Sequence, residues 1–441
     1  MLERLTGWAW SWPTIGLFLV TGLWFSVRTG FFQIFGLRRW WRGTAGQMLR
    51  TGEGTGGLSP LQTLSTALAA TIGTGSIAGV ATALTFGGPG AIFWMWVSAM
   101  LAMMTGWAEK TLSVACREKT ADGAYRGGPA LWLERKGFRI LSRFFALCVV
   151  MSSFGMGNLV QSNSMAQALE GAVGIPKFLT GIAAAALTAL ALAGGLNRLG
   201  KVCERLVPVM AVLYLAGGLW VILAHADALP AALGEIIGSA LNGDAIFGGA
   251  GAMAIQYGLA RGVCTNEAGL GSTPMIHCAS GNDDPAKEGN WGIFEVFFAT
   301  IVVCTITALV ILTSGVMGDG RMTGALLTAR AFSTVMGRWG GAFVALCLAL
   351  FGFSSLLGWS WYGRCALAWL TKGRGERLYY AVFLLAICAG SVLELRPVWQ
   401  ISDIFNALMA WPSLLSLLLW SETILQYGPE GKKRRERAGA A

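Results

Sequence analysis

Long apolar runs recur along the whole chain and are separated by short polar loops. Each run has about the 20 residues that a helix needs to cross the hydrocarbon core of a bilayer, which is about 30 Å thick. The pattern therefore predicts an all-α membrane protein with eleven transmembrane helices. The predicted spans are 13–33, 60–85, 91–115, 144–171, 178–196, 206–224, 245–272, 291–314, 340–370, 378–395 and 398–425.

Composition supports an integral membrane protein that forms a single domain over residues 1–441. Hydrophobic residues make up 54% of the chain and charged residues only 13%, whereas soluble domains carry about 25% charged residues. The net charge of +10 lies in short loops and one tail, so it does not indicate a nucleic-acid surface. The nine cysteines lie mostly in apolar runs without a CxxC pair, which argues against a disulfide framework or a metal site.

Two of the apolar runs are interrupted by glycine and small polar residues. The first reads TALAATIGTGSIAGVATAL (66–84) and the second reads AIQYGLARGVCTNEAGLGSTP (254–274). Within hydrocarbon, backbone groups cannot stay unpaired, so such breaks are tolerated only where they line a cavity. A pair of interrupted helices, one in each half of a membrane protein, is the pattern expected of a transporter's substrate and ion site.

The position of the two breaks predicts an inverted repeat. We interpret 13–33 as an uncleaved leading helix, 60–224 as a first block of five helices and 245–425 as a second block. Because five is odd, the second block is inverted relative to the first. The loops on the side of the basic tail 426–441 carry roughly four times as many lysines and arginines as the loops on the opposite side. This bias predicts a cytoplasmic C-terminus and an external N-terminus.

The residues at the breaks have suitable chemistry for binding a small charged ligand. In Thr71–Ser76 two glycines and three hydroxyl residues lie in mid-span, where freed amides favour a carboxylate and freed carbonyls favour a cation. Close helix packing through small residues is the alternative interpretation. At the second break, Arg261, Asn266 and Glu267 either face a cavity or lie in the membrane interface. His277 is expected just past the span.

Two further spans carry polar residues in apolar surroundings. Phe154, Asn158, Gln161 and Met165 share one face at helical spacing, where the amides would bind a zwitterion or hold helices together. In 340–370, Ser354 and Ser355 would complete a cation site, with Trp359 beside the pocket. Serines in such helices also bond back to the preceding turn, so both interpretations stay open.

Seven segments of this sequence resemble the alanine or glycine:cation (sodium:alanine) symporter family, which belongs to the amino acid-polyamine-organocation superfamily. They are spread over most of the chain, from residue 31 to about residue 363. They are FFQIFGLRR, the run 66–95, GMGNLVQSNS, RLVPVMA, RGVCTNEAGLGS, VVCTITALVIL and FSSLLGWSWYG. The resemblance implies a LeuT-like 5+5 inverted-repeat core preceded by one extra N-terminal helix. It also implies sodium-coupled import of alanine, glycine or D-alanine by alternating access. A membrane-embedded enzyme is not expected, because the chain has only two histidines and no Ser/His/Asp or metal-ligand spacing.

The resemblance also implies site residues. The substrate-binding residues would be Thr74, Gly75, Ser76, Phe154, Asn158, Val263, Ser355 and Trp359. A sodium ion would lie between the carbonyls of Ala69 and Ile72 and the hydroxyls of Ser354 and Ser355. The expected partners are a small neutral amino acid and the lipid bilayer, for a monomer in the bacterial or archaeal inner membrane.

Three positions depart from the usual family pattern. Ser76 replaces the usual Asn, Ala299 precedes Thr300 where Asp-Thr is frequent, and Arg364 replaces Glu. These departures bear on substrate identity and ion stoichiometry. Proton coupling or a broader range of small amino acids is therefore an alternative, and an ion channel is the alternative from another class. A channel would need a ring of charges or carbonyls around a pore, which the sequence does not indicate.

Overall fold

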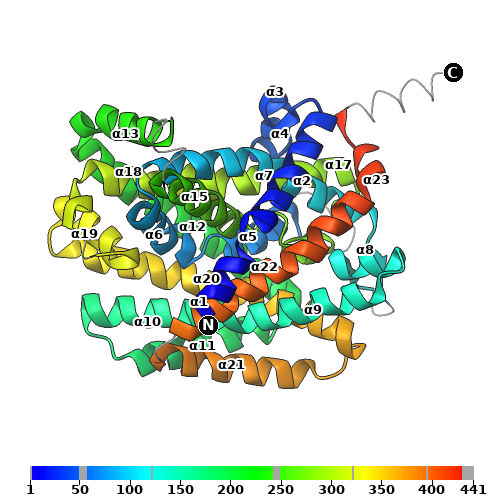
Figure 1. Cartoon of the computed structure of the whole chain (residues 1–441). Helices are drawn as coiled ribbons and strands as arrows, with labels where there is room; N and C mark the ends of the chain where they lie inside the picture. The colour runs from blue at the N-terminus through cyan, green and yellow to red at the C-terminus, as the bar shows by residue number, and fades with distance from the viewer. Residues whose placement is uncertain are drawn as a thin grey trace.

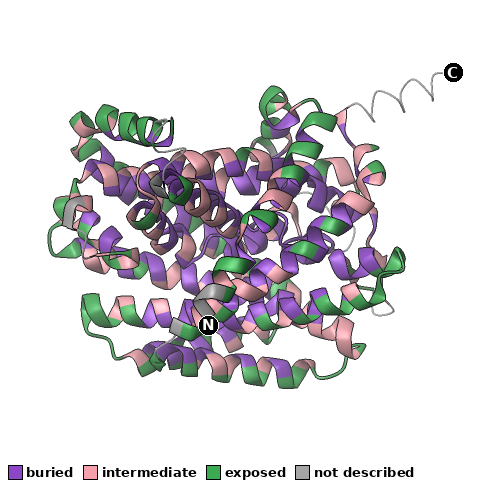
Figure 2. Cartoon of the chain, viewed as in Figure 1, coloured by how far each residue is buried: buried purple, intermediate pink, exposed green. Residues whose placement is uncertain are grey.

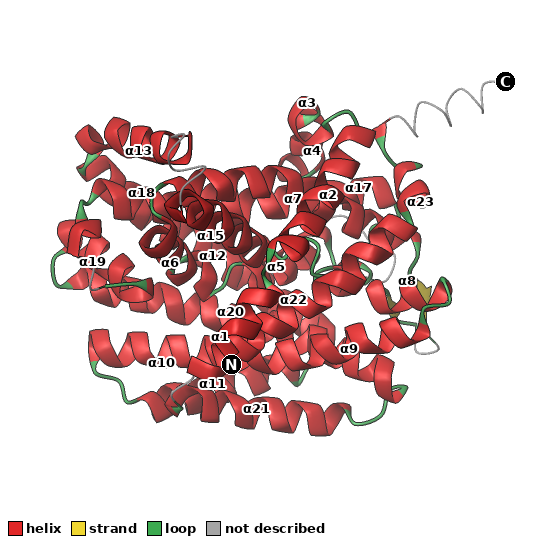
Figure 3. Ribbon diagram, viewed as in Figure 1, coloured by secondary structure: helices red, strands yellow, loops and turns green. Residues whose placement is uncertain are grey.

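Helices make up most of the protein in the computed structural model, which describes residues 2–48, 57–120, 123–241, 249–319, 322–393 and 396–429 (Figures 1 and 3). Within these ranges the strands form one small antiparallel hairpin, β1 (Glu118–Lys119) with β2 (Tyr125–Arg126). The start of the predicted span 245–272 and most of the predicted basic tail lie outside the described residues.

Seven helical segments among the described residues are long and apolar enough to cross a membrane. They are Leu5–Arg28 (most of α1, Leu2–Ala9, with α2, Trp12–Arg28), α7 (Gly90–Ala115), Arg139–Val173 (α9, η3 and α10), α12 (Gly195–Ala224), Pro285–Thr313 (α17, η5 and α18), α20 (Trp339–Thr371) and Pro397–Leu419 in α22 (Arg396–Leu419). The helix α5 (Pro60–Thr71) and the following helical segment Thr74–Gly87, which ends in α6 (Ala78–Gly87), are bent by 63° and together would make an eighth span.

Helices also occupy the three other predicted ranges. These are α11 (Lys177–Leu192), α15 (Gly249–Asn266) and α21 (Glu376–Val392). Each is shorter or less apolar than the seven long segments, so the number of eleven spans stays a prediction.

Several short helices lie outside the long segments. They are α3 (Phe32–Phe35), α4 (Leu37–Gly43), η1 (Ala45–Gln47), α8 (Pro129–Arg135), η4 (Ala226–Ala228), α13 (Leu229–Leu241), α16 (Pro274–His277), η6 (Val316–Asp319), α19 (Gly324–Met336) and α23 (Ser421–Leu425). Most of them fall where the hydropathy pattern assigns loops, but α23 lies inside the predicted span 398–425 and α3 begins inside the predicted span 13–33. In Figure 1 α13 and α19 lie at the left edge, α8 and α23 at the right edge, and α3 and α4 at the top. These short helices therefore lie at the periphery of the long ones.

The buried core lies between two groups of helices (Figure 2). In one group α7 packs along both α15 and α17; in the other α20 packs against α9 and α10, while α21 packs against α10 and α11. The helix α5 contacts α20 of the second group. It begins with a reciprocal cap, because Ser59 Oγ accepts from the Gln62 amide and the Gln62 side chain accepts from the Ser59 amide. Such a cap fixes the start of the helix.

Glycines of α15 allow close helix packing. A Cβ on Gly258 would lie 2.4 Å from the Ala91 carbonyl oxygen of α7, and one on Gly262 would lie 2.9 Å from Ser98. Both glycines have regular helical backbone within α15. The interruption predicted within 254–274 therefore begins only after Asn266, and the small residues at 258 and 262 instead allow α7 and α15 to approach.

Candidate functional site

The first break interrupts the span at the predicted place. The helix α5 ends at Thr71, Gly73 is extended, and a single 3-10 turn, η2 (Thr74–Ser76), precedes α6. Neighbouring helices pair the freed backbone groups: Thr74 N donates to Gln161 Oε1 at 3.3 Å, and Ser76 O accepts from Thr307 Oγ1 at 2.9 Å. A helix interruption in hydrocarbon needs this kind of pairing.

The second break begins after Asn266. Glu267, Gly269 and Gly271 have positive φ angles of 54°, 91° and 78°. Positive φ is rare for a residue with a side chain, so the left-handed Glu267 marks this turn as a special backbone position. The Glu267 carboxylate accepts hydrogen bonds from Ser272 Oγ at 2.8 Å and from Trp359 Nε1 at 3.2 Å. The turn is therefore joined to α20.

A small cavity of about 20 Å³ lies between the two breaks. Its lining comes from α5, both breaks, η3 (Gly155–Leu159), α10 (Val160–Val173), α15, α20 and α22. The lining residues are Ala70, Thr71, Gly73, Gly75, Met156, Gln161, Cys264, Glu267, Leu270, Trp359 and Asn406. This volume holds about one water molecule, so the cavity must widen to admit an amino acid.

Some of the predicted substrate residues lie at this cavity and others do not. Gly75 and Trp359 line it. Thr74 and Ser76 flank Gly75, are fully buried, and have side-chain oxygens without a hydrogen-bond partner among the described residues. Val263 is buried but does not line the cavity, which is reached instead by its neighbour Cys264.

Phe154 and Asn158 contact α21 rather than the cavity. The Phe154 ring packs on Tyr379 and Phe383 with centroids 5.3 and 5.8 Å apart, and Asn158 Nδ2 donates to the Phe383 carbonyl at 2.7 Å. The physical reason is the π-helical segment η3, Gly155–Leu159, which changes the rotation of the helix. As a result the shared face predicted from regular spacing is lost, and Gln161 reaches the cavity while the two earlier residues do not.

Three of the four predicted sodium ligands lie together. The Ala69 carbonyl accepts from Ser354 Oγ at 3.1 Å and from Ser355 Oγ at 3.2 Å. A Cβ on Gly73 would lie 2.6 Å from Ser355 Oγ, so the break, including Ile72, passes directly beside these serines. Carbonyl and hydroxyl oxygens are the ligands that hard cations prefer, and they converge here in a buried place between α5 and α20.

Replacing Ser355 with alanine is expected to raise the sodium concentration for half-maximal uptake about tenfold, because one of the oxygen ligands is lost. A tenfold change corresponds to a loss of about 1.4 kcal/mol in the free energy of sodium binding. Sodium titration of substrate uptake measures it. Ser360→Ala is the matched control, since Ser360 on the same helix bonds only to the Leu357 carbonyl. Equal sodium half-saturation in both variants would remove Ser355 from the cation site.

Sequence reasoning left several cavity residues out of its candidate site. Gln161 and Glu267 are polar residues in apolar spans but are not among the predicted substrate-binding residues. Asn406 of α22 is also not among them. The Asn406 Oδ1 atom is buried and has no hydrogen-bond partner in the described part of the chain. A signal for Glu267 was present, since an ionisable residue next to a predicted break is costly unless it faces a cavity.

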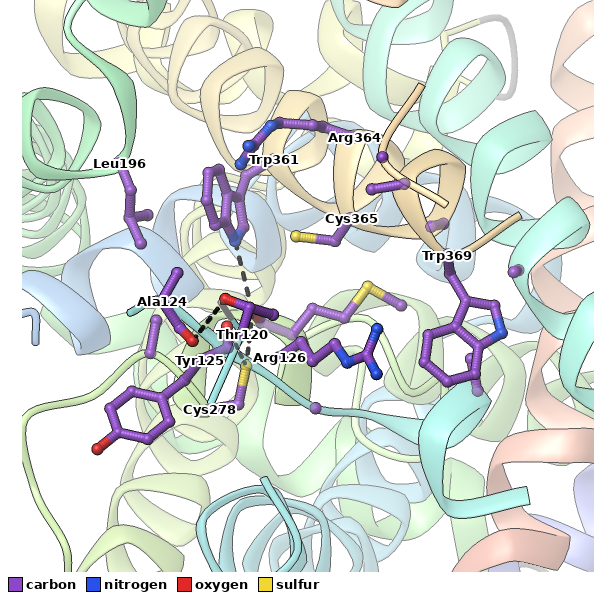
Figure 4. Close-up of a pocket in the computed structure, with 18 of the residues that line it drawn as sticks. Thr120, Ala124, Tyr125, Arg126, Leu196, Cys278, Trp361, Arg364, Cys365 and Trp369 are labelled. Carbon is purple, nitrogen blue, oxygen red and sulfur yellow. Dashed lines mark hydrogen bonds between the residues drawn. The ribbon is translucent and has the colours of Figure 1, made fainter. Parts of the chain in front are cut away.

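A second and much larger cavity, of about 980 Å³, lies at one end of the helices. Figure 4 shows Trp361, Cys365 and Trp369 of α20 along one side of it and Tyr125 and Arg126 of the hairpin along the other. Five basic residues and two acidic residues are part of its lining: Arg126, Arg139, Arg143, Arg364, Lys372, Glu134 and Glu376.

Arg364, one of the three family departures, has a defined place in this large cavity. Its Nε donates to Glu376 Oε2 at 2.8 Å, and its guanidinium lies 4.7 Å from the centre of the Trp361 ring. The arginine is therefore paired with a nearby carboxylate. Of the other departures, Ala299 is buried within η5 (Phe297–Cys304) and Ser76 lies in the first break.

The long apolar helices and the two breaks around a small cavity are the arrangement expected of a multi-pass membrane transporter. Comparison with known proteins identifies the group more closely. The model of the sodium:alanine symporter family matches residues 1–438. The chain belongs to this family.

Two relatives show the range of named substrates within the similarity. The sodium/alanine symporter AgcS of Methanococcus maripaludis is 40% identical over 434 residues, which is 96% of this chain and 95% of that protein. GlnT of Bacillus subtilis, whose name reads "Probable sodium/glutamine symporter", is 35% identical and covers 96% of this chain and 89% of its own length. The transporter class is common to both, while the named substrate differs.

A solved structure shares the fold. MhsT in complex with L-phenylalanine superposes with a TM-score of 0.59 at 13% sequence identity, over 83% of this chain and 90% of that chain. At this identity the likeness shows a common helical architecture and carries nothing about the ligand.

Proposed function

We propose that this chain is a secondary active symporter that imports a small neutral amino acid (alanine, glycine or D-alanine) together with sodium. The observation that carries the proposal is the meeting of the two interrupted helices at one small cavity, with the Ala69 carbonyl and the Ser354 and Ser355 hydroxyls beside it. Membership of the sodium:alanine symporter family supports the same class of substrate and the same coupling ion.

The proposed architecture is a LeuT-like core of two inverted five-helix repeats, preceded by one extra N-terminal helix. We place the protein in the plasma membrane, with the N-terminus outside and the C-terminus in the cytoplasm, because of the distribution of lysine and arginine. The large basic cavity then opens to the cytoplasm. The helices α5, α6, α7, α15, α17 and α18 would rock against α9, α10, α11, α20 and α21. The two groups meet where α5 contacts α20.

Each end of a zwitterionic substrate has a chemically suitable partner at the cavity. The amides of Thr74–Ser76 lie where the first helix is interrupted, and a helix N-terminus such as that of α6 favours a carboxylate. The Glu267 carboxylate lines the opposite break and would accept hydrogen bonds from the substrate ammonium. Gln161, which accepts from Thr74 N in this structure, would exchange that bond for one to the substrate.

The Trp359 side chain sets the size of the cavity in this proposal. It is 2% exposed, lines the cavity and donates from its Nε1 to Glu267. Replacing it with alanine should therefore allow uptake of leucine or methionine, with a rate at least tenfold above the wild type. Competition of labelled alanine uptake by a panel of amino acids measures this.

Trp369→Ala is the matched control for the Trp359 variant, because Trp369 lies on the same helix but lines the large cavity. It is expected to keep the wild-type selectivity. If Trp359→Ala admits leucine and methionine no better than Trp369→Ala does, then Trp359 does not limit substrate size.

Reconstitution into proteoliposomes tests the proposed function as a whole. Labelled alanine should accumulate against its gradient when sodium is high outside, and accumulation should stop when potassium replaces sodium. Accumulation driven by a proton gradient alone would favour the proton-coupled alternative. A channel would instead conduct sodium in the absence of any amino acid and would transport no amino acid together with sodium. That result would overturn the proposal.

A further inference from the structure

A chain of buried charged side chains lies behind the second break, outside the cavity. His277 of α16 contacts Glu288 Oε1 through Nδ1 at 2.6 Å and Glu295 Oε1 through Nε2 at 2.5 Å. Glu295 also pairs with Lys110 Nζ of α7 at 3.1 Å, and Lys110 lies 3.5 Å from Glu109. All five side chains are at most 1% exposed. We call Glu288, His277 and Glu295 the histidine triad.

The geometry of the triad fixes its proton content. A neutral imidazole carries one N–H, so only one of its nitrogens donates while the other presents a lone pair. Here both nitrogens lie within hydrogen-bond distance of carboxylate oxygens. With a neutral ring and two ionised carboxylates, a nitrogen lone pair would face an oxygen lone pair at about this distance. The triad therefore requires one more proton. On the ring, this proton makes His277 an imidazolium that donates to a carboxylate from each nitrogen.

We propose that the histidine triad is a buried proton-binding site, and that its bound proton holds the segment after the second break in place for transport. The signs alternate along the contacts when this proton is bound: Glu109, Lys110, Glu295, His277 and Glu288 are negative, positive, negative, positive and negative. Loss of the proton would leave three carboxylates and one ammonium buried together, which is strongly unfavourable.

The triad is linked to the transport site on one side. Lys110 Nζ donates to Thr273 Oγ1 at 2.6 Å, and Glu109 Oε1 accepts from the Gly271 amide at 3.0 Å. Both partners belong to the turn that carries Glu267 to the cavity. Any change in the charge of the triad thus acts directly on the backbone of the second break.

The other side of the triad lies just below the protein surface. Glu288 Oε2 accepts from Asn282 Nδ2 at 3.0 Å and from Ser280 Oγ at 3.1 Å, and Asn282 is partly exposed. A proton can therefore exchange at this end without passing through the substrate cavity. Among the described residues, no group of three or more His, Cys, Asp or Glu side chains is arranged to hold a metal ion.

Other charged and titratable groups surround the triad and belong to its electrostatic environment. They are Glu109, Lys110 and Arg117 around α7, Tyr362 on α20, and Glu267, Cys278 and Asp283 on the segments next to α16 and α17. Arg117 donates to the carbonyls of Cys278 and Ser280 and pairs with Asp283, so its charge is directed to the loop rather than to the imidazole.

Direct observation of the imidazole tests the proposal. The chain has two histidines, His225 and His277, so nitrogen NMR of protein labelled at histidine gives two ring systems, assigned with His225→Gln. Burial by itself lowers the pKa of His277, but the Glu295 and Glu288 carboxylates outweigh it and raise the pKa to about 9. Both nitrogens of His277 should therefore be protonated at pH 8, well above the value of about 6.5 for free histidine.

A singly protonated His277 ring at pH 7 would overturn the proposal. This measurement uses the wild-type protein and depends on no assumption about the substrate. The NMR result for His277 can therefore be interpreted even if the proposed transport function is wrong. It can also be interpreted if a variant fails to fold.

Transport supplies the second measurement. Alanine exchange at saturating sodium on both sides should decline as the pH rises through about 9, because the favourable contribution of the charged ring is lost there. Glu288→Gln should move this decline to lower pH by about one to two units, since one stabilising carboxylate is removed. The amino group of alanine titrates in a similar range, so the shift between variants carries the test.

His225→Gln is the matched control and should keep the wild-type profile. An unchanged midpoint in Glu288→Gln, or a His277→Gln variant that follows the wild-type pH profile, would show that the triad proton has no role in transport.

Discussion

Replacing Glu267 with glutamine is expected to lower the sodium-dependent uptake of alanine by about tenfold to 100-fold. Hydrogen bonds to a charged group contribute about 1.5–3 kcal/mol, and 1.4 kcal/mol corresponds to a factor of ten. Glutamine keeps the size of the side chain. Its carbonyl oxygen can still accept from Trp359 Nε1, while its amide nitrogen can donate to Ser272 Oγ in place of the bond that Ser272 donates to Glu267 in the wild type. The variant therefore removes the negative charge that would bind the substrate ammonium, with little change in packing.

Glu204→Gln is the control for this charge removal. Glu204 is a half-buried carboxylate on α12 that accepts from Gln62 Nε2 at 3.0 Å, away from the cavity. Initial rates of labelled alanine uptake should stay close to the wild type in Glu204→Gln and fall in Glu267→Gln, with the loss seen mainly in the apparent affinity for alanine. Wild-type affinity in Glu267→Gln would exclude this carboxylate as a substrate ligand.

Replacing Gly73 with alanine is expected to reduce sodium-dependent uptake at least tenfold. A methyl group at this position would lie 2.6 Å from Ser355 Oγ and 3.3 Å from Gln161 Oε1. Both side chains belong to the proposed ion and substrate sites, and the added carbon forces one of them to move. The sodium half-saturation should rise together with the loss in rate, because Ser355 is the nearer neighbour.

Gly79→Ala provides the comparison on the same interrupted span. A Cβ on Gly79 would meet nothing within 4 Å, and Gly79 lies in the helix α6, where alanine is the better helix former. This variant should transport like the wild type. Equal uptake by the two alanine variants would mean that the close approach of the first break to α20 is not part of the ion site.

The first break could be predicted from the sequence because its signal is local. Glycines and hydroxyl residues in the middle of an apolar run are incompatible with a regular lipid-exposed helix, and the helix does end at Thr71, next to Gly73. At the second break the same signal extended from Gly258 to Gly271. Composition alone does not separate glycines that allow helices to approach from glycines that adopt positive φ. The structure divides them at Asn266.

The positions of Phe154 and Asn158 could not be predicted from spacing. Regular periodicity assigns them the same face as Gln161, but a π-helical segment begins at Gly155. A π-helical turn depends on the packing of the surrounding helices, so no local pattern in the sequence identifies it. For the same reason Asn406, from the last long helix, entered the cavity lining only through the tertiary fold.

The contacts within the histidine triad could not be predicted from the sequence pattern either. His277, Glu288 and Glu295 are separated by 11 and 7 residues in the sequence, and Lys110 comes from a distant helix. Lys110 and Glu295 fall inside predicted spans, and His277 and Glu288 fall beside them. Their contacts arise from the packing of α16 and α17 against α7. Charge compensation across three elements becomes visible only when those elements are placed in space.

Equilibrium binding of labelled alanine to the purified protein, measured at increasing sodium concentration, is the most direct test that both interrupted helices form one shared site. Ligands that stabilise the same closed arrangement must strengthen each other's binding to an equal extent. The affinity for alanine should therefore rise at least tenfold between sodium-free and saturating sodium solution, and potassium should not replace sodium. An alanine affinity that is independent of sodium would contradict a site in which the two breaks hold the amino acid and the cation side by side.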